Sequence, residues 1–202
     1  VIMKKTCIEL FAGAGGLALG LEKAGFEEIG LIEIDKKACD TLRLNRPNWN
    51  VIEEDIVEFS KKDLLKEFNL QKGELDLLSG GYPCQSFSYA GKRLGIDDVR
   101  GTMFYYYAEF LKQLQPKMFL AENVKGLTTH EGGKTLQTML DVFQDLGYEV
   151  EWKVLDAWDY GVAEKRQRVV IIGTRLDLKD KVKFKYPKPH EYKPVLRDIL
   201  QD

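Results

Sequence analysis

The sequence predicts an α/β fold in which a doubly wound, mostly parallel seven-stranded sheet carries helices on both faces. The first observation is that seven short apolar, β-rich runs alternate with segments of helical period, as in parallel strands joined by covering helices. The second is the glycine-rich stretch FAGAGG, which lies between the first of these runs and a helical segment. A length of 202 residues with 44% hydrophobic residues suits a single domain, which we expect to span residues 1–202.

The predicted elements follow one another along the chain. We expect strands at residues 6–10, 29–34, 50–54, 75–80, 117–123, 149–157 and 168–174. The clearest helix covers residues 103–114, where apolar residues recur at intervals of three and four and predict a buried stripe of Met103, Phe104, Tyr107, Phe110, Leu111 and Leu114. A second buried stripe is predicted at Leu136, Met139, Leu140 and Phe143. The Lys- and Pro-rich segment 179–194 has the composition of a linker, so we expect this end of the chain to lead out of the domain.

Composition limits the possible partners. The net charge of −2 gives no general basic surface for nucleic acid, so any such contact must be local. No apolar run is long enough to span a bilayer. The cysteines Cys7, Cys39 and Cys84 lack metal-ligand spacing, and we interpret them as reduced thiols. We therefore expect a soluble, cytoplasmic protein with no membrane contact and no metal.

Polar residues and glycines follow the first three predicted strands. In an open parallel sheet a ligand binds beyond the carboxyl ends of the strands. The first strand is followed by Gly13, Gly15 and Gly16, which permit close approach of a ligand, and the second by Glu33, which can accept hydrogen bonds from ribose hydroxyls. The third is followed by Asp55 and Ile56, placed to meet an adenine ring. The glycine spacing differs from G-x-G-x-x-G, which favours a nucleoside without phosphates over NAD. A tight turn and solvated carboxylates are the structural alternatives.

The later strand ends carry reactive side chains. Cys84 lies in the loop GGYPCQ after the fourth strand, where a thiol is a candidate nucleophile, although a lone cysteine is more often a small buried apolar residue. Glu122 ends the fifth strand and is either a proton donor or a structural carboxylate. Arg166 and Arg168 alternate ahead of the last strand, which places both on one face. They form either a fork for an anion or carbonyl oxygen or a solvated charge cluster.

Taken together, FAGAGG, PCQSFS, ENV and RQR, in that order, resemble the cytosine-C5 DNA methyltransferase family, and the resemblance runs from Thr6 to Leu200. The resemblance implies a Rossmann-like methyltransferase, an enzyme of restriction-modification systems that acts on duplex DNA in the cytoplasm or nucleoid. It implies S-adenosylmethionine as cofactor, surrounded by the glycine turn and by Phe11, Glu33, Ile34, Asp55, Ile56 and Pro83. It further implies that Cys84 attacks C6 of a flipped-out cytosine, that Glu122 contacts the base, and that Arg166 and Arg168 assist.

The segment from Ser86 to Thr102 is Gly-rich, polar and long for a connection, so we expect a lid over the flipped base. A passive loop is the alternative. The residues expected to contact DNA are Gln85, Ser86, Ser88, Lys92 and Arg93.

The chain departs from the family pattern in two places. Ala163 and Glu164 stand where the family has Pro-Gln, and the sequence stops at Asp202, before a target-recognition domain and a closing motif. We therefore expect either a missing C-terminal half or a second polypeptide as partner. The alternatives are an incomplete or non-catalytic subunit, an enzyme acting on RNA, and a nicotinamide oxidoreductase.

Overall fold

The computed structural model describes residues 4–84 and 95–200, which form one seven-stranded sheet with the spatial order β3-β2-β1-β4-β5-β7-β6. The strands are β1 (Lys5–Leu10), β2 (Phe26–Glu33), β3 (Val51–Glu53), β4 (Leu77–Gly80), β5 (Met118–Val124), β6 (Tyr148–Asp156) and β7 (Gln167–Arg175). Neighbouring strands are parallel, except that β7 is antiparallel to both β5 and β6. The predicted fold class and the seven predicted strands are confirmed.

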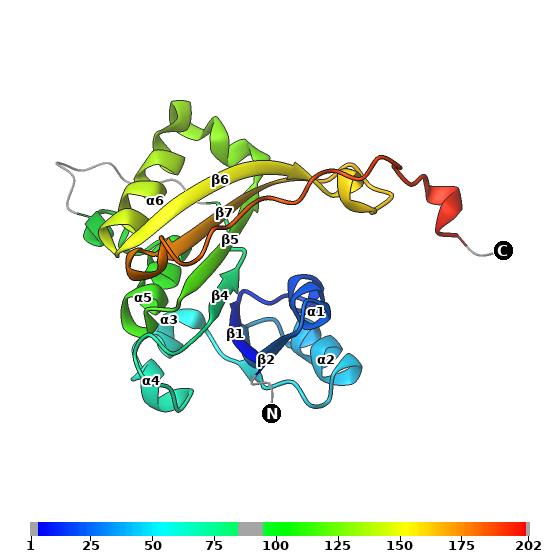
Figure 1. Ribbon diagram of the computed structural model, residues 1–202. Coiled ribbons are helices and arrows are strands. Elements are labelled where there is room, and N and C mark those ends of the chain that lie inside the picture. The colour runs from blue at the N-terminus through cyan, green and yellow to red at the C-terminus, as the bar shows by residue number, and fades with distance from the viewer. Residues whose placement is uncertain (1–3, 85–94, 201–202) are drawn as a thin grey trace.

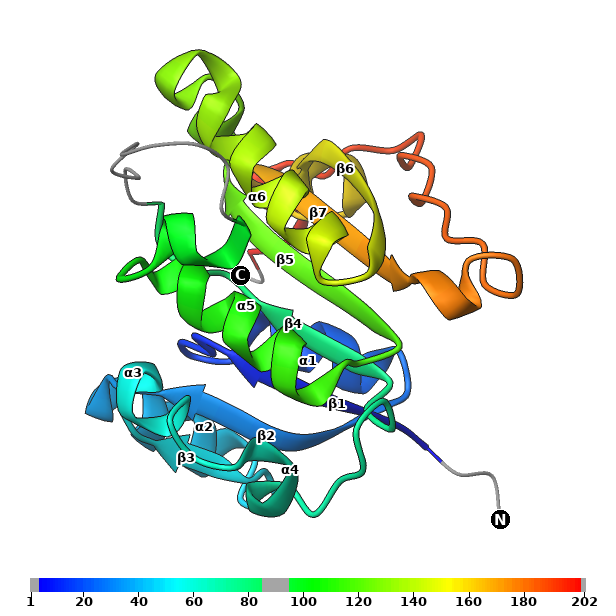
Figure 2. The same ribbon diagram turned by 90° about the vertical axis from the view of Figure 1, so that its left-hand side faces the viewer.

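Helices cover both faces of this sheet (Figure 1, Figure 2). The α-helices are α1 (Gly16–Lys23), α2 (Lys36–Asn45), α3 (Ile56–Phe59), α4 (Leu64–Glu67), α5 (Met103–Leu114) and α6 (Lys134–Asp145). Short 3₁₀ helices are η1 (Gly95–Val99), η2 (Lys125–Thr128), η3 (His130–Gly133), η4 (Ala157–Tyr160), η5 (Leu176–Leu178) and η6 (Leu196–Asp198). No helix in the described residues is long and apolar enough to cross a membrane.

The main core lies between the sheet and helices α3 to α6. The predicted stripes on α5 and α6 face this core, where all members are buried except Met103 and Leu140, which are half-buried. Aromatic rings join the layers, because Phe143 of α6 lies 4.3 Å from Phe119 of β5 between ring centroids. Helices α1 and α2 pack on the opposite face, where Ala18 and Leu42 contact Leu31 of β2. Burial of these two apolar layers holds both halves of the sheet in place.

The chain order creates a crevice at one edge of the sheet. The connection from β1 leads through α1 to β2, whereas the connection from β4 leads through α5 to β5 on the other side. The carboxyl ends of β1 and β4 are therefore the point where the strand order reverses, which is where ligands bind in open α/β sheets. Because β7 runs antiparallel, its first residues lie at this same edge, and Arg168 pairs with Val124 at the end of β5.

The C-terminal segment is attached to the sheet before it leads away from it (Figure 1). The Tyr186 hydroxyl donates to the Val170 backbone carbonyl at 2.9 Å and also lies 3.2 Å from that of Glu151. Near η4, the Trp158 indole Nε1 donates to the Pro194 carbonyl at 2.8 Å. The C-terminal segment is thus hydrogen-bonded to the rest of the domain as far as Pro194. The expectation that the chain continues into another domain stays a prediction.

Two buried carboxyl groups lie on adjacent strands. Glu9 of β1 is 2% exposed and Glu28 of β2 is 8% exposed. Within the described part of the chain, Oε2 of Glu9 and both carboxyl oxygens of Glu28 are buried without a hydrogen-bond partner. Burial, with the nearby charge of Glu28 as a second cause, raises the pKa of Glu9 to about 9. Burial also raises the pKa of Glu28 to about 7.

These two groups predict that the fold loses stability as the pH rises. In the unfolded chain both carboxyls ionise near their ordinary pKa of 4.5, whereas the folded chain holds their protons to about pH 7 and 9. Their contribution to the free energy of unfolding is therefore fully present below pH 4.5. It is lost as the pH rises from 4.5 through about 7 for Glu28 and about 9 for Glu9. Each unit of pKa difference corresponds to about 1.4 kcal/mol. We expect the melting temperature, followed by circular dichroism, to fall between pH 5 and pH 9.

The double variant Glu9→Gln/Glu28→Gln is expected to flatten this fall, because neither amide ionises. Glu27→Gln is the matched control, since Glu27 is the exposed neighbour of Glu28 on β2. An unchanged pH dependence in the double variant would show that other groups cause it.

Candidate active site

A cavity of about 330 Å³ lies at the carboxyl ends of the first four strands. Six of the predicted cofactor residues line it: Phe11, Glu33, Ile34, Asp55, Ile56 and Pro83. The sequence analysis did not single out its remaining lining residues as site residues, which are Ile32, Glu54, Val57 and Met103. Gly13, Gly15 and Gly16 are not among the lining residues. The strand-end residues thus converge on one cavity.

The glycine turn is held in shape by the carboxylate of Glu33. Gly15 precedes α1 with φ of 89°, a left-handed angle that favours glycine, and a Cβ atom there would lie 2.6 Å from the Leu42 side chain, which would have to shift. Gly13 N donates to Oε2 of Glu33 at 2.7 Å. Glu33 therefore links the turn after β1 to the end of β2.

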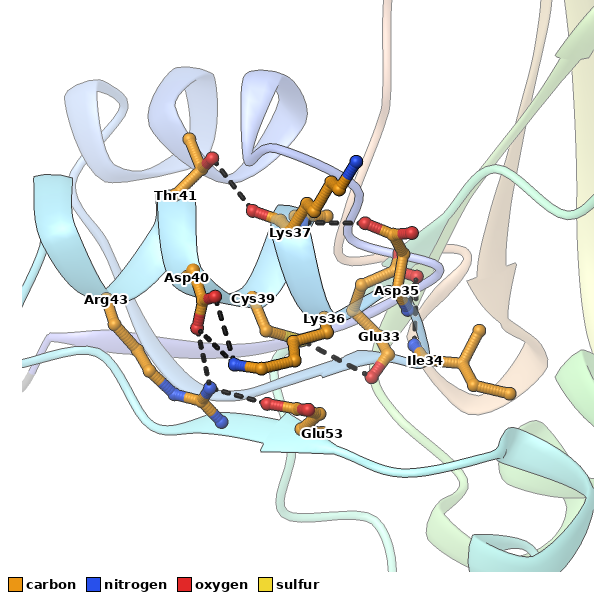
Figure 3. A network of polar contacts seen from close by, with 11 residues as sticks. Glu33, Ile34, Asp35, Lys36, Lys37, Cys39, Asp40, Thr41, Arg43 and Glu53 are labelled. Carbon is orange, nitrogen blue, oxygen red and sulfur yellow. Dashed lines mark hydrogen bonds and ion pairs between the residues drawn. The ribbon is translucent and has the colours of Figure 1, made fainter.

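The other oxygen of Glu33 organises the start of α2 (Figure 3). Oε1 accepts from the backbone N–H groups of Ile34 and Asp35, both at 2.8 Å. The side chain of Asp35 then caps α2 by accepting from Ala38 N at 2.8 Å. Further along α2, Arg43 Nη1 lies 2.6 Å from Oε2 of Glu53, which ties the helix to β3. This network fixes the wall of the cavity around Glu33.

The carboxylates after β3 are also anchored. Oδ1 of Asp55 accepts from Val57 N at 2.9 Å and caps α3. Oε2 of Glu54 accepts from Lys62 Nζ at 2.7 Å. The Lys62 ammonium in turn lies 4.7 Å from the centre of the Phe59 ring. One oxygen of each carboxylate thus makes a hydrogen bond within the protein.

The segment that carries Cys84 is fixed by β5. Asn123 is 3% exposed, and its Nδ2 donates to the Tyr82 carbonyl at 2.9 Å. Its own Oδ1 accepts from Val124 N at 2.8 Å, so both ends of the amide are engaged. Cys84 follows two residues after Tyr82 and is half-buried, and burial raises the pKa of its thiol. The sequence analysis did not assign Asn123 a role; its place in ENV, directly after Glu122, was the available signal.

Glu122 lies on the same edge as the Cys84 segment. Its Oε1 lies 2.7 Å from Arg168 Nε, with side chains 32% and 26% exposed. A Cβ atom on Gly81 would lie 2.6 Å from Oε2 of Glu122, so the carboxylate rests against the backbone three residues before Cys84. This close approach is possible because residue 81 has no side chain.

The two predicted arginines differ in their contacts. The antiparallel direction of β7 brings Arg168 to Glu122. Arg166 is exposed, and its backbone N–H donates to Oδ1 of Asp156 at 3.0 Å. Its guanidinium group makes no hydrogen bond or ion pair to the residues that the structure describes. The structure therefore places the Arg168 side chain, and not that of Arg166, in contact with the Glu122 carboxylate.

The predicted DNA-contacting residues Gln85, Ser86, Ser88, Lys92 and Arg93 lie outside the described residues, so the lid stays a prediction. At its far end, Thr102 caps α5 by accepting from Tyr105 N at 3.2 Å. Among the residues that are described, no group of three or more His, Cys, Asp or Glu side chains could hold a metal ion.

Comparison with solved structures gives the class of protein. A structure described as a putative DNA modification methyltransferase encoded within an Escherichia coli prophage matches 95% of this chain and 52% of its own, with a TM-score of 0.76 and 29% identity. The fold is that of the α/β methyltransferases.

Comparison of sequences gives the family. The family model for C-5 cytosine-specific DNA methylases matches residues 5–202, and the chain belongs to this family. It is 59% identical over 191 residues to the Type II methyltransferase M.Sau96I of Staphylococcus aureus, covering 94% of this chain and 44% of that protein. It is 52% identical over 195 residues to M.PspPI of Psychrobacter sp., covering 96% and 45%. The chain thus spans less than half the length of these two relatives.

Proposed function

We propose that this protein transfers a methyl group from S-adenosylmethionine to C5 of cytosine in duplex DNA, through a covalent bond between Cys84 and C6 of a flipped-out base. The observation that carries the proposal is that Glu122 and the segment leading to Cys84 lie together at one sheet edge. Asn123 fixes the segment before Cys84, and Glu122 rests against Gly81 in that same segment. The nucleoside-sized cavity opens beside them, lined by Pro83, the residue before Cys84.

The donor set of the cavity supports the proposed cofactor. Phe11 and Ile56 offer apolar surface to a purine ring, while Glu33 and Asp55 offer acceptors for hydroxyl and amino groups. Among the residues that the structure describes, the cavity lining includes no lysine, arginine or histidine, so a pyrophosphate would meet carboxylates without a counter-charge from these residues. This favours a nucleoside with a cationic sulfonium over NAD. When bound, S-adenosylmethionine supplies an electrophilic methyl group.

The protein side chains have separate tasks in the proposed reaction. C5 of cytosine is a weak nucleophile, and addition of the Cys84 thiolate to C6 raises the electron density at C5. Because burial raises the pKa of Cys84, its thiol must pass its proton, through water or directly, to the Glu122 carboxylate as the base arrives. Glu122 then donates a proton or hydrogen bond to N3 and stabilises the charge that develops on the ring. Arg168 positions that carboxyl group. After methyl transfer, water or another base takes the C5 proton, the C5–C6 double bond re-forms, and Cys84 leaves C6 as a thiolate.

Trapping of the adduct tests this proposal. In duplex DNA synthesised with 5-fluorocytosine in place of cytosine, fluorine cannot leave as the C5 proton does, so the covalent bond persists. We expect the full-length protein, given S-adenosylmethionine, to form an adduct that peptide mapping places on Cys84. A denaturation-stable adduct on Cys7 or Cys39, or none while ordinary DNA is methylated, would contradict the proposal.

We also propose that recognition of the DNA target resides in polypeptide outside the aligned region, either a C-terminal half or a second chain. Support comes from the 44% and 45% of the two relatives that this chain spans. The net charge of −2 is consistent with a DNA-reading surface elsewhere. The Type II methyltransferase M.AquIA of Picosynechococcus sp., 40% identical, is covered to 77%, so the aligned region also occurs in much shorter proteins. A partner-dependent subunit is the second candidate function.

Asn123→Ala is expected to lower the rate of methyl transfer at saturating cofactor by about 100-fold, because the loop carrying Cys84 loses its anchor and small displacements of a reacting group are costly. The dissociation constant of S-adenosylhomocysteine, measured by calorimetry, is expected to stay unchanged. Gln113→Ala is the matched control, since Gln113 donates to the Ser60 carbonyl at 3.0 Å in the same manner but away from the site. Equal rate losses in the two variants would show that the effect is general destabilisation.

A further inference from the structure

The 3₁₀ helix η4 contacts residues 187–194, which we call the exit segment because the described chain leads away from the sheet after them (Figure 1). The Trp158 indole Nε1 donates to the Pro194 carbonyl at 2.8 Å. Pro194 is buried, whereas the residues on either side of it are exposed. This hydrogen bond therefore holds the last residue of the exit segment, at the point where the chain turns away.

Two further residues of η4 bind the exit segment through different groups. The Asp159 carbonyl accepts from His190 N at 2.8 Å. The Tyr160 hydroxyl donates to the Pro187 carbonyl at 3.2 Å. Together with Trp158, three consecutive residues thus each make a hydrogen bond to the exit segment, and these bonds hold it at both ends.

The exit segment is stiff between these contacts. It contains Pro187, Pro189 and Pro194, whose rings restrict the φ angle. Proline-rich segments act as semi-rigid spacers and not as flexible linkers. The contacts with η4 therefore set the course of the whole segment.

The Trp158 ring also lies against two cations. Lys193 Nζ, from the exit segment, lies 4.9 Å from the ring centre, and Lys165 Nζ, from the loop before β7, lies 4.8 Å from it. An ammonium group over an indole ring is attracted by the electrons of the ring. The Lys193 ammonium also lies 2.6 Å from Oδ1 of Asp159. The Trp158 side chain thus connects the exit segment with the loop before β7.

The helix η4 is itself attached to the start of β7. Oδ1 of Asp156 accepts from Trp158 N at 3.2 Å and from Arg166 N at 3.0 Å. Ala157 N donates to the Arg166 carbonyl at 3.1 Å. Arg168, which lies in the candidate active site, follows two residues later. The exit segment is therefore connected, through η4, to the sheet edge that carries the candidate active site.

We propose that Trp158 is a positioning residue for DNA, because it sets the direction in which the chain leaves the sheet edge near Cys84. The inference rests on the proposed function, and it takes the polypeptide that reads the DNA target to be a C-terminal half of the same chain. That half then begins at a point fixed by η4. DNA bound to it meets the active site in one orientation, and little further ordering is needed on binding.

Hydrogen exchange and DNA binding, both measured on the full-length protein, test the two parts of this inference. Trp158→Leu loses the N–H donor and the aromatic ring, and we expect amide exchange in the exit segment, followed by mass spectrometry, to become faster. The dissociation constant of a duplex that the wild type methylates is expected to rise by about tenfold, because binding must then order the exit segment. Affinity for S-adenosylhomocysteine is expected to stay unchanged, since Trp158 does not line the cavity.

Trp152→Leu is the matched control. Trp152 lies on β6 and is 43% exposed, and its indole makes no hydrogen bond to the residues that the structure describes. This variant is expected to keep the wild-type exchange of the exit segment and the wild-type affinity for DNA. Trp158→Phe keeps a ring for the two ammonium groups but lacks the N–H donor, so both of its values are expected to lie between those of the wild type and of Trp158→Leu.

The possible outcomes separate this inference from the proposed function. Unchanged exchange in Trp158→Leu, or faster exchange with unchanged affinity for DNA, overturns the inference alone. An equal loss of DNA affinity in Trp152→Leu, or a loss of S-adenosylhomocysteine binding in Trp158→Leu, also overturns it, because the effect is then general destabilisation. A wild type that methylates DNA only after a second chain is added overturns it too. A wild type that methylates no cytosine in duplex DNA overturns the proposed function, and the inference with it.

Discussion

Cys84→Ser is expected to lower the rate of methyl transfer by about 10⁴-fold or more, while binding of S-adenosylhomocysteine stays within error of the wild type. A serine hydroxyl is a far weaker nucleophile than a thiolate toward C6, and removal of a covalent catalyst costs several orders of magnitude. The cofactor is unaffected because the cavity wall is formed by Pro83, not by Cys84. Methyl incorporation into DNA and calorimetry measure the two quantities.

Cys39→Ser is the matched control for this variant. Cys39 is fully buried on α2, and its thiol donates to the Glu33 carbonyl at 3.5 Å, a contact that a serine hydroxyl can keep. We expect it to retain methyl transfer. A Cys84→Ser enzyme with the wild-type rate would remove Cys84 from the proposed mechanism.

Glu122→Gln is expected to lower the rate by about 10²- to 10⁴-fold, since an amide cannot supply the proton that N3 requires. Its carboxyl group rests against Gly81 and Arg168 and does not line the cavity, so the dissociation constant of S-adenosylhomocysteine is expected to be unchanged. Glu33→Ala is the matched comparison on the cofactor side. It is expected to weaken binding by at least roughly 1.5–3 kcal/mol, through loss of charge-assisted hydrogen bonds to ribose and of the bonds that hold the glycine turn and the start of α2.

The pair of variants separates the two roles of the carboxylates. Rates at saturating cofactor report on Glu122, and calorimetry reports on Glu33. Equal losses of cofactor affinity in both variants would argue against a division between a base side and a cofactor side.

The strands could be predicted because their apolar runs are long enough to stand out from the helices between them. The boundary of β2 was the least accurate, since it begins at Phe26 and includes the buried Glu28, whereas carboxyl groups in a sequence usually indicate exposed chain. The antiparallel direction of β7 could not be predicted, because it is set by pairing with β5 and β6, and the local sequence pattern of a strand does not show its pairing partners.

The candidate site was predicted in part for a similar reason. The rule that ligands lie at strand ends predicted Glu33 and Asp55, and the family resemblance added Pro83; all three line one cavity. Met103 was interpreted as a core residue of α5, because a helical stripe gives no sign that its first residue also reaches a cavity. Glu54 was overlooked beside Asp55, since which neighbour along an irregular segment faces a ligand depends on the turn into α3.

The bond from Gly13 to Glu33 has a consequence for ligand affinity. A glycine-rich turn has high conformational entropy, and a ligand that had to order it would bind more weakly by that amount. Here the ordering is done by the Glu33 carboxylate, which joins the turn to the end of β2 and holds the first residues of α2 with its other oxygen. The turn is thus ordered by the fold itself, so the proposed cofactor would not have to order it on binding.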